Sequence, residues 1–159
     1  MRDRGWRVFA TARAPEHLEH LTDTVGVESV YLDYTEPESI AAAADHVLEA
    51  TDGSLNALFN NGAYGQPGAI EDLPTDALRA QFEANVFGWH DLTRRMIAPM
   101  RARNAGRIVQ CSSAHEGDGR DFNDTFLHQV RRFFKPHHVV QGIIKRSQIR
   151  VDLFSQVTR

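Results

Sequence analysis

Short apolar runs of strand-forming residues alternate with helix-forming stretches over the first two thirds of the chain. The predicted strands cover residues 7–12, 27–32, 55–60 and 107–112. The predicted helices cover residues 16–21, 37–50 and 74–103. We expect Thr35 to cap the second helix and the third to break near Pro99. Because this alternation is typical of βαβ units, the sequence predicts an α/β fold with a parallel sheet and helices on both faces.

The composition changes near residue 114. Residues 1–113 carry ten arginines and no lysine against sixteen acidic residues, a net charge of −6. Residues 114–159 carry eight basic residues against five acidic ones, a net charge of +3, and include both lysines. We therefore divide the chain into residues 1–113 and a divergent tail, residues 114–159, whose sequence predicts no definite structure.

Composition and charge exclude several classes of protein. The hydrophobic fraction of 42% and the charged fraction of 25% are typical of globular domains. No apolar run approaches the ~20 residues of a membrane span, so we expect no membrane partner. The net charge of −3 gives no indication of nucleic-acid binding. A single cysteine, Cys111, excludes an internal disulfide and favours a cytoplasmic location.

The tail contains histidines and acidic residues, but their spacing predicts no metal site. The histidines of the tail, which with Cys111 fit no ordinary zinc pattern, are His115, His128, His137 and His138. The acidic residues Asp118, Asp121 and Asp124 do not match the spacing of a calcium loop. The basic and aromatic run at residues 131–135 is most simply a solvated face. We therefore expect no bound metal.

Polar residues follow the predicted strands at the points where they end. Arg13 follows the first strand, Asp33 the second, Asn60 and Asn61 the third, and Ser113 the fourth. Ligands of parallel α/β sheets bind at the carboxyl ends of the strands. These five residues are therefore the first candidates for a binding site.

Five segments follow one another in residues 5–113, and in chain order they are G-W-R-V-F-A-T-A-R, L-D-Y-T, N-N-G-A-Y-G, F-E-A-N-V-F-G and G-R-I-V-Q-C-S-S. Together they resemble the short-chain dehydrogenase/reductase family, whose members are NAD(P)-dependent Rossmann-fold oxidoreductases. Each segment alone is a weak signal, and their order and intervals carry the resemblance. It implies a partial Rossmann-like, dinucleotide-binding sheet over residues 1–113. By descent, it also implies NADP-dependent hydride transfer to or from a small carbonyl or alcohol substrate.

The resemblance also implies which residues meet the cofactor. Arg13 resembles a cation that pairs with the 2′-phosphate of NADP, where an acidic residue would favour NAD. Asp33 resembles the residue that meets the adenine amino group. Asn60-Asn61-Gly62-Ala63 stands where the family has Asn-Asn-Ala-Gly beside the cofactor, with the last two residues exchanged. From the residues alone, a solvated arginine, a turn aspartate and a surface turn explain the same positions.

Two further residues resemble members of the family's catalytic group. Asn85 resembles the asparagine that holds a water in the proton relay, and Ser113 resembles the serine that bonds the substrate oxygen. Without the resemblance, Asn85 is a tolerated polar residue in a helix, and Ser113 is a strand-end residue that forms turn hydrogen bonds.

Two family motifs have no counterpart in the chain. The glycine-rich turn T-G-x-x-x-G-x-G, which holds the pyrophosphate at a helix N-terminus, does not occur. All three tyrosines precede Ser113, and at the family spacing of Y-x-x-x-K stand Phe126 and Val130. We therefore expect the product of a truncated, frame-shifted or rearranged gene, which binds NADP weakly or not at all and is inactive. The alternative is a non-enzymatic remnant that acts as a binding or interaction module, or a fragment without function.

The resemblance also makes a prediction about the sheet. In the family's strand order, the first strand lies between the strands represented here by residues 7–12 and 55–60, and this chain begins after it. Backbone groups on both neighbours then lack partners. We expect the two strands either to close up or to leave open edges, which would give low stability or self-association.

Overall fold

The computed structural model describes residues 5–61, 64–66, 68–110 and 152–157. Its strands are β1 (Trp6–Ala12), β2 (Glu28–Tyr31), β3 (Ala57–Asn60), β4 (Arg107–Gln110) and β5 (Asp152–Val157). Its α-helices are α1 (Pro15–His20), α2 (Pro37–Ala50), α3 (Thr75–Phe82) and α4 (Gly88–Ala102). Two π-helical turns extend α1 and join α3 to α4: η2 (Leu21–Val25) and η3 (Glu83–Phe87). The strands predicted over the first 110 residues are confirmed, with ends that differ by one or two residues.

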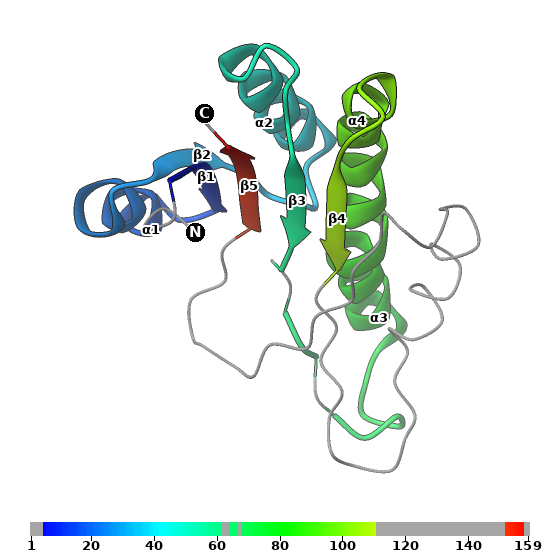
Figure 1. Cartoon of the computed structure of the whole chain (residues 1–159). Helices are drawn as coiled ribbons and strands as arrows, with labels where there is room; N and C mark the ends of the chain where they lie inside the picture. The colour runs from blue at the N-terminus through cyan, green and yellow to red at the C-terminus, as the bar shows by residue number, and fades with distance from the viewer. Residues whose placement is uncertain (1–4, 62–63, 67, 111–151, 158–159) are drawn as a thin grey trace.

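In the described part of the chain, the strands form one sheet in the order β2-β1-β5-β3-β4 (Figure 1). β1 pairs in parallel with β2, and β3 pairs in parallel with β4. β5 lies between β1 and β3 and runs antiparallel to both. The predicted α/β fold with a partial parallel sheet is confirmed, and one antiparallel strand stands at its centre.

The main apolar core lies between the sheet and the helices α2 and α4. Phe9 of β1 and Leu58 of β3 are fully buried and belong to one cluster with Leu92 and Met96 of α4. Leu92, Met96 and Met100 recur at intervals of four, which places them on one face of α4. Within the described ranges, no helix combines the length and the apolar character that a bilayer span requires.

Two predictions about helix ends and breaks are wrong in detail. α4 continues through Pro99, which lies in its last turn, where the absent N–H removes only one helical hydrogen bond. The long helical stretch departs from α-geometry at η3 instead. Thr35 does not cap α2, because the N-cap position is Glu36 and the Thr35 hydroxyl donates to Asp33.

The prediction for the centre of the sheet is also wrong. The strands β1 and β3 neither close up nor leave a gap, because β5 pairs with both. β5 opposes six residues of β1, from Trp6 opposite Val157 to Thr11 opposite Asp152. It opposes three residues of β3, from Ala57 to Phe59. A strand from the tail therefore supplies the backbone partners that the neighbouring strands need.

Candidate functional site

The four parallel strands end at one edge of the sheet, which we call the carboxyl edge. Arg13 follows β1 directly, Asp33 lies two residues beyond β2, and Asn60 is the last residue of β3. The chain passes from β1 to β2 on one side of β5 and then crosses to β3 and β4 on the other side. Such a reversal is the switch point at which open α/β sheets bind ligands. The geometry therefore places the candidate site at the carboxyl edge, around β5.

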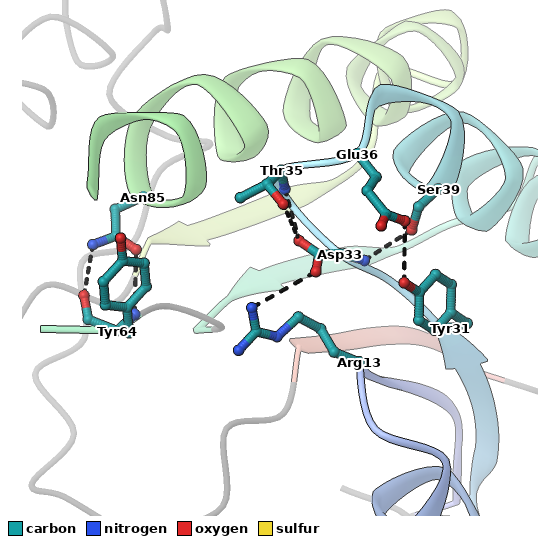
Figure 2. Close-up of polar contacts among 8 residues, drawn as sticks. All are labelled: Arg13, Tyr31, Asp33, Thr35, Glu36, Ser39, Tyr64 and Asn85. Carbon is teal, nitrogen blue, oxygen red and sulfur yellow. Dashed lines mark hydrogen bonds and ion pairs between the residues drawn. The ribbon is translucent and has the colours of Figure 1, made fainter. Parts of the chain in front are cut away.

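Asp33 is held in a fixed position on the β2 side of this edge. Its Oδ1 accepts hydrogen bonds from the backbone N–H and the hydroxyl of Thr35, each at 2.8 Å. Its own backbone N–H donates to Oγ of Ser39 at 2.8 Å. Its second oxygen, Oδ2, lies 3.6 Å from Nη1 of Arg13 (Figure 2). Because the Arg13 side chain is 64% exposed and that of Asp33 only 16%, the guanidinium can turn toward an anion while the carboxylate stays in place.

A second carboxylate and an aromatic ring lie beside Asp33. The hydroxyl of Tyr31 donates to Oε2 of Glu36 at 3.1 Å (Figure 2). This hydrogen bond is the main cause of a raised pKa of Tyr31, which burial and the charge of Glu36 raise further. Tyr31 and Asp33 are two residues apart in extended chain, so their side chains lie on the same face. Tyr31 is 44% exposed and therefore presents part of its ring to solvent next to Asp33.

On the other side of the edge, Asn60 belongs to a neutral, buried network. Its Nδ2 donates to Oγ1 of Thr93 at 3.0 Å and to Oε1 of Gln110 at 2.9 Å. These hydrogen bonds tie β3 to α4 and to β4, and all three side chains are buried. The side chain of Asn60 has no exposed surface, and its Oδ1 accepts no hydrogen bond in the described structure. The predicted cofactor contact of Asn60 stays a prediction, while its bonds to Thr93 and Gln110 give it a structural role.

Asn85 holds the backbone of the loop that follows β3. Its Nδ2 donates to the carbonyl oxygen of Tyr64 at 2.8 Å, and its Oδ1 accepts from the Tyr64 N–H at 3.3 Å (Figure 2). Asn85 lies in η3, and π-helical turns occur frequently at functional sites because they re-aim side chains. The side-chain amide of Asn85 thus fixes both backbone groups of Tyr64, and its NH₂ and its oxygen each keep capacity for one further hydrogen bond.

Several predicted site residues lie outside the described residues. They are Gly62 and the catalytic candidate Ser113, and Cys111 and the histidines of the tail, for which no metal site was predicted, lie outside the described residues too. Asn61 is described, half-buried and directly after β3. The structure therefore brings Arg13 and Asp33 together and gives Asn60 and Asn85 separate partners. Within the described residues, no group of three histidine, cysteine or acidic side chains is arranged to hold a metal ion.

Comparison with known proteins identifies the family. Residues 1–123 match the family described as "short chain dehydrogenase". The chain belongs to the short-chain dehydrogenase family. An uncharacterized oxidoreductase of Escherichia coli, YbbO, is 36% identical over 113 residues, which cover 71% of this chain and 42% of the relative. Oxidoreductase BOA17 of Botryotinia fuckeliana is 34% identical over 112 residues, which cover 69% of this chain and 40% of the relative.

Solved structures share the fold of this chain. A short-chain dehydrogenase from Streptomyces avermitilis is 38% identical, with a TM-score of 0.60, over 66% of this chain and 39% of its own. The actinorhodin polyketide ketoreductase with NADPH is 25% identical, with a TM-score of 0.67, over 80% of this chain and 52% of its own. The chain thus spans about two fifths of the length of the curated relatives named above. All predicted site residues fall inside the family match, whereas β5 lies beyond it.

Sequence reasoning missed several residues of the carboxyl edge. Tyr31 and Glu36 flank Asp33. The sequence contained a signal for Tyr31, because residues two apart in a strand share a face, and this spacing places Tyr31 beside the predicted site residue Asp33. Thr93 and Gln110 had a weaker signal, namely polar residues at positions that the apolar pattern of a helix and a strand assigns to the core.

Proposed function

We propose that this chain derives from an NADP-dependent oxidoreductase that transfers hydride between the nicotinamide and a small carbonyl or alcohol. We further assign the adenosine-phosphate end of the cofactor to Arg13 and Asp33. The observation that carries this proposal is the exposed guanidinium of Arg13 beside the fixed carboxylate of Asp33. Family membership and the NADPH of the actinorhodin ketoreductase support the choice of cofactor.

The residues present fit the adenosine end of NADP. Arg13 can exchange its 3.6 Å contact with Asp33 for a 2′-phosphate, because a phosphate accepts stronger, charge-assisted hydrogen bonds from a guanidinium. Oδ2 of Asp33 is not used by Thr35 and can accept the adenine amino group. When bound, the cofactor would supply the hydride or its acceptor. Asn85 would contribute by fixing the loop after β3 through Tyr64.

We also propose that the chain alone has no carbonyl-reducing activity. The three tyrosines of the chain are Tyr31, Tyr34 and Tyr64, and Ser113 follows all of them. General acid and base catalysis contributes roughly 10²–10⁴-fold and requires a titratable group within hydrogen-bond reach. The 159-residue chain taken alone is therefore expected to bind NADP weakly and to reduce no carbonyl. A non-enzymatic nucleotide-binding module is the alternative within the same site, and a cytoplasmic location is part of the same proposal.

The first experiment is calorimetric titration of the 159-residue chain with NADPH and with NADH. We expect weak binding with a preference for NADPH of roughly tenfold, since a hydrogen bond to a charged group is worth about 1.5–3 kcal/mol. Arg13→Glu should abolish the preference. Arg79→Glu, the same charge change at an exposed position of α3, is the matched control and should preserve it. Sub-micromolar binding of NADPH, or a preference that survives Arg13→Glu, would contradict the proposal.

The second experiment is an NADPH-oxidation assay of the purified chain with a panel of aldehydes and ketones. The expected result is no turnover above the control without protein. Turnover that disappears in Ser113→Ala would show that the chain keeps an active site and would refute its inactivity. If His128→Ala also removed the turnover, a histidine would be the replacement proton donor.

A further inference from the structure

Gly88, the first residue of α4, packs directly against the turn that holds Asp33. A Cβ atom at Gly88 would lie 2.6 Å from Cβ of Tyr34 and closer still to the Tyr34 carbonyl oxygen. Ordinary contacts of a Cβ atom begin at about 3.4 Å. Because the nearest obstacle is backbone, no side-chain rotation removes it. The position therefore has room for glycine alone.

The backbone conformation of Gly88 does not itself require glycine. Its φ of −63° and ψ of −43° are those of an ordinary right-handed helix. Inside a helix, glycine is less favourable than any residue except proline, because it loses the most backbone freedom on folding. Local structure thus disfavours glycine at this position, and the close approach to Tyr34 is what requires it.

Tyr34 lies inside the β-turn that positions the carboxylate of Asp33. The backbone N–H of Glu36 closes this turn by donating to the carbonyl oxygen of Asp33 at 3.1 Å. Oδ1 of Asp33 is bonded within the turn, and Oδ2 faces Arg13 (Figure 2). The buried ring of Tyr34 lies 6.4 Å from the ring of Trp89, the second residue of α4. The start of α4 thus contacts the turn through backbone and ring, one residue from Asp33.

We propose that Gly88 is a positioning residue for adenine recognition, because its lack of a side chain lets α4 seat the turn where Oδ2 of Asp33 meets the adenine amino group. This inference rests on the proposed function and concerns the specificity of the same site. A methyl group at Gly88 would have to push Tyr34 from 2.6 Å to about 3.4 Å away. Such a displacement exceeds the roughly 0.5 Å within which a binding group must be held. Arg13 lies outside the turn, so its contact with the 2′-phosphate should persist.

The experiment compares adenosine 2′-monophosphate with inosine 2′-monophosphate by calorimetric titration of the full 159-residue chain. Adenine carries an amino group where hypoxanthine carries a carbonyl oxygen, which a carboxylate repels. The wild type should therefore bind the adenosine ligand roughly tenfold more tightly, through Oδ2 of Asp33. Gly88→Ala should reduce this preference to less than about twofold and should change inosine 2′-monophosphate binding by no more than about threefold.

Two further variants control the result. Asp33→Asn can keep the bonds of Oδ1 to Thr35 while an NH₂ group replaces Oδ2, so it should abolish or reverse the preference. Gly106→Ala is the matched control, because a Cβ atom there would lie 2.6 Å from the side chain of Met100, just before β4 at the opposite edge of the sheet. It introduces similar crowding away from the turn and should keep the preference for adenosine.

A measurement on the wild type covers the case in which Gly88→Ala does not fold. In a chain with isotope-labelled glycine, the magnetic-resonance signal of the Gly88 amide should shift on saturation with adenosine 2′-monophosphate. The amide signal of Gly106 should not shift. A Gly88 signal that stays unchanged at saturation would overturn the inference.

The outcomes separate this inference from the proposed function. If Asp33→Asn loses the preference for adenosine but a folded Gly88→Ala keeps it, only the role of Gly88 is wrong. That role is also wrong if Gly106→Ala loses the preference equally. If the wild type binds neither ligand, shows no preference, or binds no better than Arg13→Glu, the proposed function fails and the inference fails with it.

Discussion

The two halves of the sheet use polar side chains in opposite ways. In the β1–β2 half, the polar contacts include two ion pairs whose arginines water reaches, Arg7 with Glu28 and Arg13 with Asp33. In the β3–β4 half, the main polar contact is a neutral network closed off from water, in which Asn60 bonds Thr93 and Gln110. The first arrangement can exchange its partners for a ligand, and the second cannot do so without exposing the core.

The physical reason lies in desolvation. A neutral amide can be buried at little net cost when its hydrogen bonds are made, whereas a buried ion needs a nearly ideal partner. Exposed ion pairs are weak, so Arg13 loses little when it leaves Asp33. The charged half is therefore suited to binding a ligand, and the neutral half to holding the strands together.

The largest expected effect comes from breaking the connection between the two halves. Phe154 of β5 is opposite Phe9 of β1 and Leu58 of β3. Phe154→Pro removes a backbone donor from the centre of the sheet, where proline is excluded. We expect a loss of about 3 kcal/mol or more, the scale of a proline inside a regular element, measured by chemical unfolding.

The matched control is Thr158→Pro, which introduces the same residue just after β5 ends. It should change the free energy of unfolding by no more than about 0.5 kcal/mol. Equal stability of Phe154→Pro and the wild type would mean that β5 does not join the halves. Self-association through sheet edges stays a prediction, and light scattering of Phe154→Pro is its most sensitive test, because this variant would open the edges of β1 and β3.

The second effect tests the neutral half. Asn60→Ala removes the donor to Thr93 and Gln110 and leaves two buried acceptors without it. We expect a loss of about 2 kcal/mol, since a buried polar group without its partner costs about 1–3 kcal/mol. The measurement is the free energy of unfolding in urea at neutral pH.

Asn56→Ala provides the control for this substitution. Its side chain accepts from Nη2 of Arg103 at 3.0 Å in an exposed contact, so its loss should be small. If the two variants lost equal stability, burial would not explain how much the hydrogen bonds of Asn60 contribute to the free energy of unfolding. An Asn60→Ala variant of wild-type stability that lost NADPH binding would favour the predicted cofactor contact over the structural role.

The parts of the fold that the sequence predicted are those with a local signal. β1 and β3 carry apolar residues at strand spacing, and α4 carries Leu92 and Met96 at helical spacing, so their burial could be anticipated. The family resemblance, confirmed by the match over residues 1–123, predicted that a further strand position separates β1 from β3. Pro99 misled the prediction because proline in a last turn removes only one hydrogen bond, which sequence alone does not reveal.

The features of the fold and the site that could not be predicted depend on contacts between distant segments. The slot between β1 and β3 was predicted, but the strand that fills it is specified by backbone pairing and not by residue type. Likewise, Asp33 was expected beside a nucleotide or in a turn, and its bonds to Thr35 and its approach to Arg13 are compatible with both at once. The burial of Asn60 followed from packing against α4, which its motif alone did not indicate.

The smallest expected effect is the loss of stability when an ion pair near the surface is removed. Arg7 donates through Nε and Nη2 to the two carboxylate oxygens of Glu28, at 2.6 and 2.8 Å, and also to the carbonyl oxygen of Ala50. The hydrogen bonds from Arg7 lower the pKa of Glu28 below its usual value. A lowered carboxyl pKa stabilises the fold above the pKa of the unfolded chain, and this contribution is lost as the pH falls through the folded-state pKa. Glu28→Gln should therefore flatten the decline of stability between about pH 5 and pH 3.

A second ion pair shows what sets the size of this effect. Nη1 of Arg79 lies 2.6 Å from Oδ1 of Asp76, the same distance as the shortest contact between Arg7 and Glu28. The side chains of the first pair are 73% and 89% exposed, against 33% and 45% for Arg7 and Glu28. Exposed pairs lose most of their attraction to water and to side-chain entropy, so at neutral pH Asp76→Asn should cost a few tenths of a kcal/mol and Glu28→Gln at most about 1 kcal/mol. Because the two distances are equal, a larger loss in Asp76→Asn would show that solvent exposure does not govern the strength of these contacts, and the contrast between the charged and the neutral half would lose its physical basis.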